Sequence, residues 1–172
     1  MVCCACPWFA CLSSVASQRV RQGATILTDA VPHLSGSLLG GVHHLLIRVY
    51  YEDTDFSGVV YHASYLRFLE RGRTELLRAQ GHAQGALHQE MEGLAFVVRR
   101  MTIDFARAAR MDDVLTVVTR PGEVRGASML LLQEVRRADE VLVTAEVQVA
   151  AVRAGRAVRI PDGLRAALER AG

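Results

Sequence analysis

The sequence predicts an α+β domain in which one long helix packs against a long antiparallel β-sheet. Three observations support this prediction: one strand pattern precedes a single long helical pattern, four or five strand patterns follow it, and the breaks between those strands are short. Short connections join antiparallel neighbours, because parallel strands need a crossover of a dozen or more residues. With one long helix available, the sheet must wrap around it to cover its apolar face.

The first strand is predicted over residues 44–51, a run rich in β-forming residues that ends at an acidic turn. Residues 52–61 contain a glycine and several polar groups, and we expect a loop there. The long helix is predicted to begin near Ser64, a residue type that caps helices, and to stop at Gly81. Its apolar residues recur at helical spacing, namely Tyr65, Phe68, Leu69, Leu76 and Leu77.

Gly72 lies in the middle of this helical pattern. Glycine there costs about 1 kcal/mol relative to alanine, so we expect it to mark close packing against a strand.

A short helix is predicted over 83–92. Strands are then predicted over 94–107, 113–124, 127–136, 141–152 and 156–160. Pro161 opens a last helix that ends near Arg170. The remaining face and edges of the sheet are expected to need a second subunit.

Composition fits one globular domain with an N-terminal extension. The chain has 172 residues, 51% of them apolar, and a net charge of +2, which gives no reason to expect a nucleic-acid partner. Residues 1–41 hold all four cysteines and show no regular period. We therefore expect a poorly ordered extension over 1–41, a folded domain over 42–172, and a reducing, cytoplasmic environment. The apolar stretch 2–12 is too short to cross a bilayer.

The loop before the long helix concentrates groups that can do chemistry. Glu52, Asp53 and Asp55 lie within four positions, and their repulsion is expected to raise the pKa of one of them. Gly58 allows a sharp turn or a close approach to a ligand. The N-terminus of the helix offers unpaired N–H groups that could hold an oxyanion. These residues alone leave two interpretations open, a site or a turn without chemistry.

A calcium loop is a weaker alternative for the same segment. Asp53, Asp55, Ser57 and Gly58 match the first positions of an EF-hand loop, but Ser64 stands where that loop needs a bidentate glutamate. The preceding segment also has a strand pattern instead of a helical one. We therefore predict no metal site.

A longer motif favours the interpretation as a site. The run from Tyr51 to Tyr65 fits Y-x-D-T-D-x-x-G-x-V-Y-H-x-x-Y, and the helix continues it with Phe68, Glu70, Arg73, Thr74 and Glu75. This pattern resembles the signature of the YbgC-like branch of the 4-hydroxybenzoyl-CoA thioesterase family, and residues 109–115 resemble the turn that leads into a strand in that family. The resemblance spans residues 43–168.

The resemblance implies a hotdog fold, a long antiparallel sheet wrapped around a central helix. It implies dimers that form the site and often pair into tetramers, and hydrolysis of acyl-CoA thioesters without a metal or bound cofactor. It also suggests association with an acyl carrier protein or with the Tol-Pal envelope complex.

The same resemblance assigns roles to individual residues. Asp55 would act as nucleophile or general base, with Tyr51 and His62 beside it and the backbone N–H of His62 as the oxyanion donor. The residues expected to bind substrate are Gly58, Val60, Tyr61 and Tyr65. Two alternatives remain open: a hotdog hydratase or dehydratase, and a non-catalytic module that binds acyl-CoA or an acyl carrier.

Overall fold

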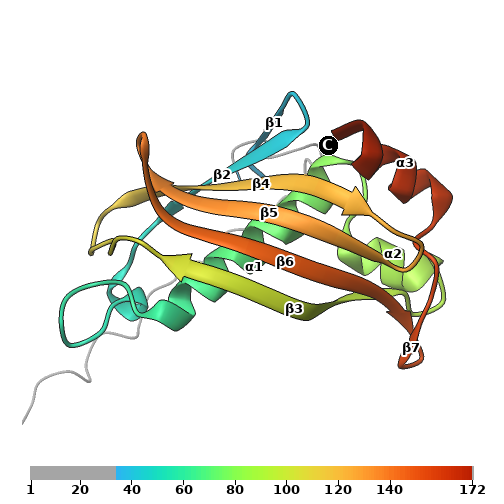
Figure 1. Ribbon diagram of the computed structural model, residues 1–172, viewed down its shortest axis with the longest axis horizontal. Coiled ribbons are helices and arrows are strands. Elements are labelled where there is room, and N and C mark those ends of the chain that lie inside the picture. The colour runs from blue at the N-terminus through green and yellow to red at the C-terminus, as the bar shows by residue number, and fades with distance from the viewer. Residues whose placement is uncertain (1–33, 172) are drawn as a thin grey trace, which may run out of the picture. The chain divides into compact units, whose positions relative to one another are not determined.

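The computed structural model of the protein describes residues 34–171 (Figure 1). The predictions for the cysteines and for residues 1–33 lie outside this part of the chain. The first elements are β1 (Ser37–Leu39), β2 (Val42–Arg48), the 3₁₀ turn η1 (Tyr51–Asp53), α1 (His62–Ala79) and α2 (Gln84–Glu90). The later elements are β3 (Ala95–Phe105), β4 (Val114–Val124), β5 (Ser128–Arg137), β6 (Glu140–Arg153), β7 (Arg156–Ala157) and α3 (Asp162–Ala171).

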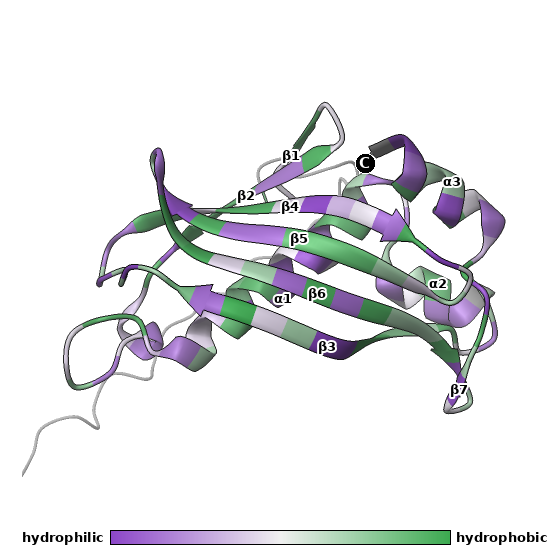
Figure 2. Cartoon of the chain, in the orientation of Figure 1, coloured by the Kyte–Doolittle hydropathy of each residue, from purple (hydrophilic) through white to green (hydrophobic). Residues whose placement is uncertain are grey.

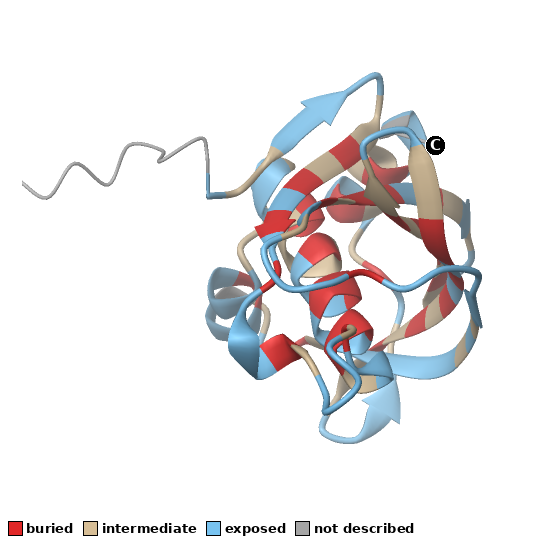
Figure 3. Ribbon diagram, turned by 90° about the vertical axis from the view of Figure 1, so that its left-hand side faces the viewer, coloured by how far each residue is buried: buried red, intermediate tan, exposed pale blue. Residues whose placement is uncertain are grey.

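The strands form one antiparallel sheet in the order β1-β2-β4-β5-β6-β3, and β7 adds to β6. The sheet curves around α1, which is seen nearly end-on in Figure 3 with buried residues facing the strands. Polar and apolar residues alternate along β4, β5 and β6 (Figure 2), as expected for strands that bury one face. The predicted α+β architecture, a sheet wrapped around one long helix, is confirmed.

The buried face of α1 contains every apolar residue that the helical spacing selected, from Tyr65 to Leu77. The predicted helix start is wrong by two residues. Tyr61 is the residue before the first helical turn, and Ser64 is buried inside the helix, where its hydroxyl accepts a hydrogen bond from Arg67 at 2.9 Å. The helix stops as predicted, because Gly81 follows it with φ +82°.

Among residues 34–171, no helix is long and apolar enough to cross a membrane.

Two strand boundaries differ from the sequence prediction. β2 ends at Arg48, so Tyr51 belongs to η1 and not to the strand. β7 covers only Arg156–Ala157, although a strand was predicted over 156–160. β4 runs through Pro121-Gly122, and its pairing with β5 shifts register there. A bulge accommodates proline because the extra residue leaves one N–H out of the ladder. The short strand β1 was not predicted; it lies within the segment assigned to the extension and pairs with β2.

Gly72 is the point of closest approach between α1 and the sheet. A Cβ atom added to it would lie 2.7 Å from Cγ1 of Val117 and 2.9 Å from the hydroxyl of Thr119. Both neighbours belong to β4, and Thr119 is completely buried. The expectation that this glycine permits close packing against a strand is therefore confirmed.

Candidate active site

The loop between β2 and α1 begins with a carboxylate that stabilises the backbone. Asp53 is 4% exposed, and its Oδ2 accepts the backbone N–H of Tyr50 at 3.0 Å. Its carbonyl accepts the N–H of Tyr61 at 2.9 Å, which connects η1 to the start of α1. Asp53 therefore caps a turn, as its position suggested, and its carboxylate points away from the loop surface.

Residues 54–60 form a small hairpin that presents Asp55 to solvent. The N–H of Asp55 donates to the carbonyl of Val59 at 3.0 Å, and the N–H of Gly58 donates back to the carbonyl of Asp55 at 3.0 Å. Gly58 adopts φ +75°, a conformation that favours glycine, and no atom lies within 4 Å of the position of an added Cβ. The sharp turn expected at Gly58 is confirmed.

Ser57 sets the electrostatics of the Asp55 carboxylate. Oδ1 of Asp55 accepts the Ser57 N–H at 2.8 Å and also accepts the Ser57 hydroxyl. These bonds lower the pKa of Asp55 below its ordinary value, the hydroxyl contributing most and nearby His62 adding a small effect. Asp55 is therefore not the carboxylate whose pKa is raised by crowding. Ser57 was missed as a functional residue, although Asp-x-Ser is a recognisable side-chain turn.

The first turn of α1 lies directly after this hairpin. Tyr61 precedes the helix and makes no side-chain capping bond, and its carbonyl accepts the N–H of Ser64 at 2.8 Å. The N–H groups of His62 and Ala63 then have no partner within the helix, because the first N–H groups of a helix lack a preceding carbonyl. The rings of Tyr61 and His62 lie 4.2 Å apart, and both residues are exposed.

The aromatic residues of the loop are unusually open to solvent. Tyr51 is 83% exposed, and Phe56, next to Asp55, projects fully from the hairpin. Nothing in the local sequence pattern singled out Phe56. Large apolar side chains placed beside a carboxylate provide a surface that a ligand or a partner chain could cover.

The residues predicted to bind substrate separate into two groups. Gly58 and Tyr61 are exposed, whereas Val60 and Tyr65 are 4% and 2% exposed. The Tyr65 hydroxyl accepts the N–H of Ala109 at 2.8 Å, and the N–H of Val60 donates to the carbonyl of Ala109 at 2.8 Å. In this chain Val60 and Tyr65 thus fasten the loop to the turn before β4. Substrate contact by any of the four residues stays a prediction.

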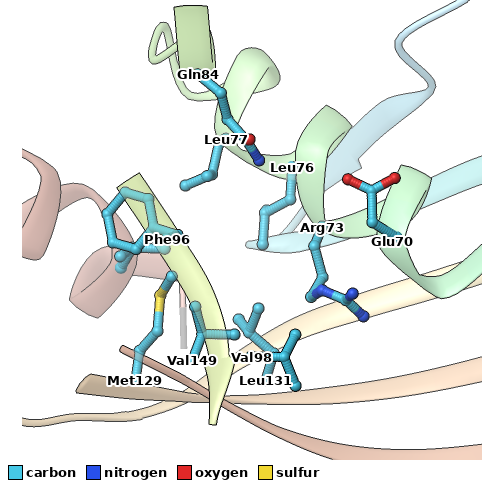
Figure 4. Close-up of a pocket in the computed structure, with 11 residues that line it drawn as sticks. Glu70, Arg73, Leu76, Leu77, Gln84, Phe96, Val98, Met129, Leu131 and Val149 are labelled. Carbon is cyan, nitrogen blue, oxygen red and sulfur yellow. The ribbon is translucent and has the colours of Figure 1, made fainter. Parts of the chain in front are cut away.

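A second feature is a cavity of about 100 Å³ between α1, α2 and the inner face of the sheet (Figure 4). Its walls are mostly apolar, including Leu77, Phe96, Val98, Met129 and Leu131, and Arg73 also lines it. The rise of an α-helix, about 1.5 Å per residue, puts Arg73 about 16 Å along α1 from His62. The cavity is therefore remote from Asp55 of the same chain.

Within residues 34–171, no cluster of three or more histidine, cysteine, aspartate or glutamate side chains is arranged to hold a metal ion. The chemistry that this arrangement can perform is attack by an ionised carboxylate, or by a water that it activates, next to unpaired N–H groups that can stabilise negative charge.

Comparison with known proteins identifies the family to which this fold belongs. Residues 57–144 match the family model described as Thioesterase superfamily. The chain is 48% identical over 123 residues to the acyl-CoA thioesterase YbgC of Haemophilus influenzae, an alignment that covers 70% of this chain and 90% of that protein. It is 49% identical over 107 residues to the acyl-CoA thioester hydrolase YbgC of Escherichia coli, covering 62% of this chain and 78% of the relative.

A solved structure, that of a probable thioesterase from Bartonella henselae, superposes with a TM-score of 0.68 at 46% identity. This match covers 70% of the present chain and 99% of the Bartonella chain. Fold, loop motif and sequence identity therefore agree, and the chain belongs to the thioesterase superfamily.

Proposed function

We propose that the protein hydrolyses acyl-CoA thioesters, converting an acyl-CoA and water into a free acid and CoA. The observation that supports this most strongly is the placement of the exposed Asp55 carboxylate just before the uncapped N-terminus of α1. The relatives named as acyl-CoA thioesterases supply the substrate class.

The proposed reaction begins with ionised Asp55. Its pKa is lowered by Ser57, so the carboxylate is charged at neutral pH and available as nucleophile or general base. As the thioester carbonyl is attacked, its oxygen gains negative charge, which the N–H of His62 stabilises. The C–S bond then breaks and the thiolate of CoA takes up a proton. If Asp55 is the general base, water is the group that attacks, and its proton passes through Asp55 to the thiolate. If Asp55 is the nucleophile, the acyl group is first held on Asp55 as a mixed anhydride, and a water molecule then cleaves it, which releases the acid, regenerates the carboxylate and supplies the proton to the thiolate. The side chains of His62 and Tyr51 orient the water, the carboxylate or the substrate.

We also propose a homodimer formed through β3. This strand ends the sheet, is 11 residues long and is unpaired on one side within the described chain. Its exposed residues include Val97, Val98 and Phe105. A long apolar edge strand invites pairing with another strand, and a second β3 related by a twofold axis supplies one.

Such a dimer would complete the site. Phe105 at the end of β3 packs against Tyr65 in the first turns of α1, with ring centroids 5.8 Å apart, whereas Phe96 near its beginning lines the cavity. Antiparallel pairing about the middle of β3 brings the Phe105 end of one chain beside the Phe96 end of the other. Asp55 of one protomer would then face the cavity of its partner, which receives the acyl group.

The direct test is release of CoA thiol from a panel of acyl-CoAs by wild type and by Asp55→Asn. We expect the variant to lose about 10²- to 10⁴-fold in kcat/KM, the usual contribution of a positioned acid or base. Glu52→Gln, an exposed carboxylate in the same loop, is the matched control and should retain wild-type activity. Equal thiol release by wild type and Asp55→Asn would contradict the proposed mechanism. Binding of acyl-CoA without thiol release would favour a binding module.

The remaining proposals concern the protein's surroundings. Cytoplasmic localisation, a dimer or tetramer, and association with an acyl carrier protein or the Tol-Pal complex rest on the family resemblance. Fractionation of cells, sedimentation and co-purification with those partners would test each of them separately.

A further inference from the structure

Arg73 brings a positive charge into a mostly apolar cavity, whose other polar lining residues are Glu70 and Gln84. Its guanidinium lies beside Val98 and Leu131 (Figure 4), and the residue is half-buried. Among residues 34–171, no carboxylate forms an ion pair with it. Burial lowers the pKa of Arg73, and the negative charge of Glu70 partly opposes this effect. Arg73 is thus a poorly solvated cation that a bound anion would stabilise.

A hydrogen-bond network on the inner face of the sheet holds this guanidinium in place. Nη1 of Arg73 donates to Oε1 of Gln133 at 2.8 Å. The Gln133 amide in turn donates to the carbonyl of Leu69 and to the hydroxyl of Thr119, each at 2.9 Å. Thr119 and Gln133 are directly paired across β4 and β5, and both are buried. One N–H of Arg73 is therefore fixed by the fold, which orients the guanidinium before any ligand arrives.

A separate network keeps the nearest carboxylate away from Arg73. Glu70 accepts the Thr74 hydroxyl at 2.7 Å, and that hydroxyl also accepts the side-chain amide of Gln84 at 3.0 Å. Glu70 and Gln84 also line the cavity, and the Glu70 carboxylate points away from the guanidinium in Figure 4. The cation is thus held inside the cavity, whereas the anion is held at its rim.

From this arrangement we infer that Arg73 selects substrates whose acyl group ends in a carboxylate, that is, short dicarboxylic acyl thioesters. The inference rests on the proposed thioesterase function and names the substrate class of that site. The guanidinium has N–H groups left to bind a carboxylate in a fork. The cavity, of about 100 Å³, is small, which favours short acyl groups.

Shape-matched substrate pairs test this inference in the wild-type protein. One pair is succinyl-CoA and 4-methylpentanoyl-CoA, and the other pair is glutaryl-CoA and 5-methylhexanoyl-CoA. In each pair the terminal carboxylate of the first substrate is replaced in the second by an isopropyl group of similar shape. Rates are corrected for hydrolysis without enzyme. We expect kcat/KM to favour the dicarboxylic member by at least about tenfold, the ratio typical of one charge-assisted hydrogen bond. A wild-type ratio that favours the neutral member would overturn the inference, and this result needs no variant.

Variants identify the residue responsible. Arg73→Gln should lose most of the preference, Arg73→Lys should keep part of it, and Glu70→Gln should increase it by removing a nearby negative charge. Arg71→Gln removes an exposed arginine from the same helix and should leave the ratio unchanged. Thermal unfolding of each variant shows whether it is folded, and a change in folding alone would not alter the ratio between two substrates of the same shape.

The outcomes separate this inference from the proposed function. If neither the neutral nor the dicarboxylic thioesters are hydrolysed in an Asp55-dependent way, the proposed function fails. If the neutral esters are hydrolysed through Asp55 but Arg73→Gln leaves the substrate ratio as in wild type, only the inference about Arg73 fails.

Discussion

The first turn and the middle of α1 are built in opposite ways. At the first turn, residues 54–62 are mostly exposed, and the bonds that orient Asp55 come from its own hairpin, within four residues. In the middle, Gly72 lies against β4, and Arg73 is oriented by Gln133, which is 60 positions away in the sequence. The comparison teaches that local sequence makes the reactive group, whereas the tertiary fold makes the cavity proposed to recognise the substrate.

The largest expected effect on stability concerns the two glycines of these regions. Gly72→Ala would force a methyl group into contact with Val117 and Thr119 on β4. Overpacking of this kind costs about 1 to 3 kcal/mol, more than alanine gains from helix propensity. The free energy of unfolding in urea should therefore decrease by that amount.

Gly58→Ala, in the hairpin before α1, is the variant with which the stability loss of Gly72→Ala is compared. No atom crowds the added methyl group, so only the strain of φ +75° remains, about 1 kcal/mol. Equal loss of stability in the two variants would show that close packing at Gly72 is not what distinguishes the regions.

Tyr65→Phe tests how the hairpin is fastened to the body of the fold. The change leaves the N–H of Ala109 without its acceptor in a buried position, at a cost of about 1 to 2 kcal/mol. Because the same turn also binds the hairpin through Val60, we expect faster amide exchange over residues 54–62 in addition to lower stability. Unchanged exchange in the hairpin would mean that Tyr65 stabilises only the core.

The smallest effect concerns the acidic limb of the pH profile. In the proposed mechanism activity requires ionised Asp55, so activity is present above the pKa of Asp55 and lost as the pH falls through it. Since that pKa is lowered in the folded protein, the limb should lie below the ordinary value of 3.8. Ser57→Ala removes the hydroxyl bond and should move the limb upward, toward that value, in a plot of log kcat/KM against pH. Circular dichroism at each pH would exclude unfolding, and an unmoved limb would contradict the role of Ser57.

The contrast between local sequence and tertiary fold also explains which features of the structure could be predicted from the sequence. The spacing of apolar residues alone identified the buried face of α1, because burial of one helix face imposes that spacing. The start of α1 was misplaced because Ser64, a common capping residue, turns its side chain into the core instead. The resemblance to a known family, and no spacing rule, selected Asp55 among three carboxylates.

The cavity could not be predicted, since its walls come from α1, α2 and four other elements distributed along the chain. The polar row of Thr119 and Gln133 was missed for the same reason. Each is a single polar residue within an apolar strand pattern, and only the register between β4 and β5 shows that they meet. The direction of the Asp55 pKa shift could not be predicted either, because a count of nearby charges does not show that Ser57 donates two hydrogen bonds to this carboxylate.

The central claim is that Asp55 of one protomer acts on an acyl group held in the cavity of the other. Two variants test it, each expected to be inactive alone: Asp55→Asn and Gln84→Trp, the latter filling the cavity from α2 and not from the proposed interface strand β3. In a hybrid dimer of the two, one site carries both changes and the other carries neither. Random mixing in equal amounts makes about half of the dimers hybrids, and each hybrid has one working site out of two. The mixture should therefore recover about a quarter of the wild-type activity per chain. No activity above that of the parents, in samples where differently tagged hybrids are isolated, would show that each site lies within one chain.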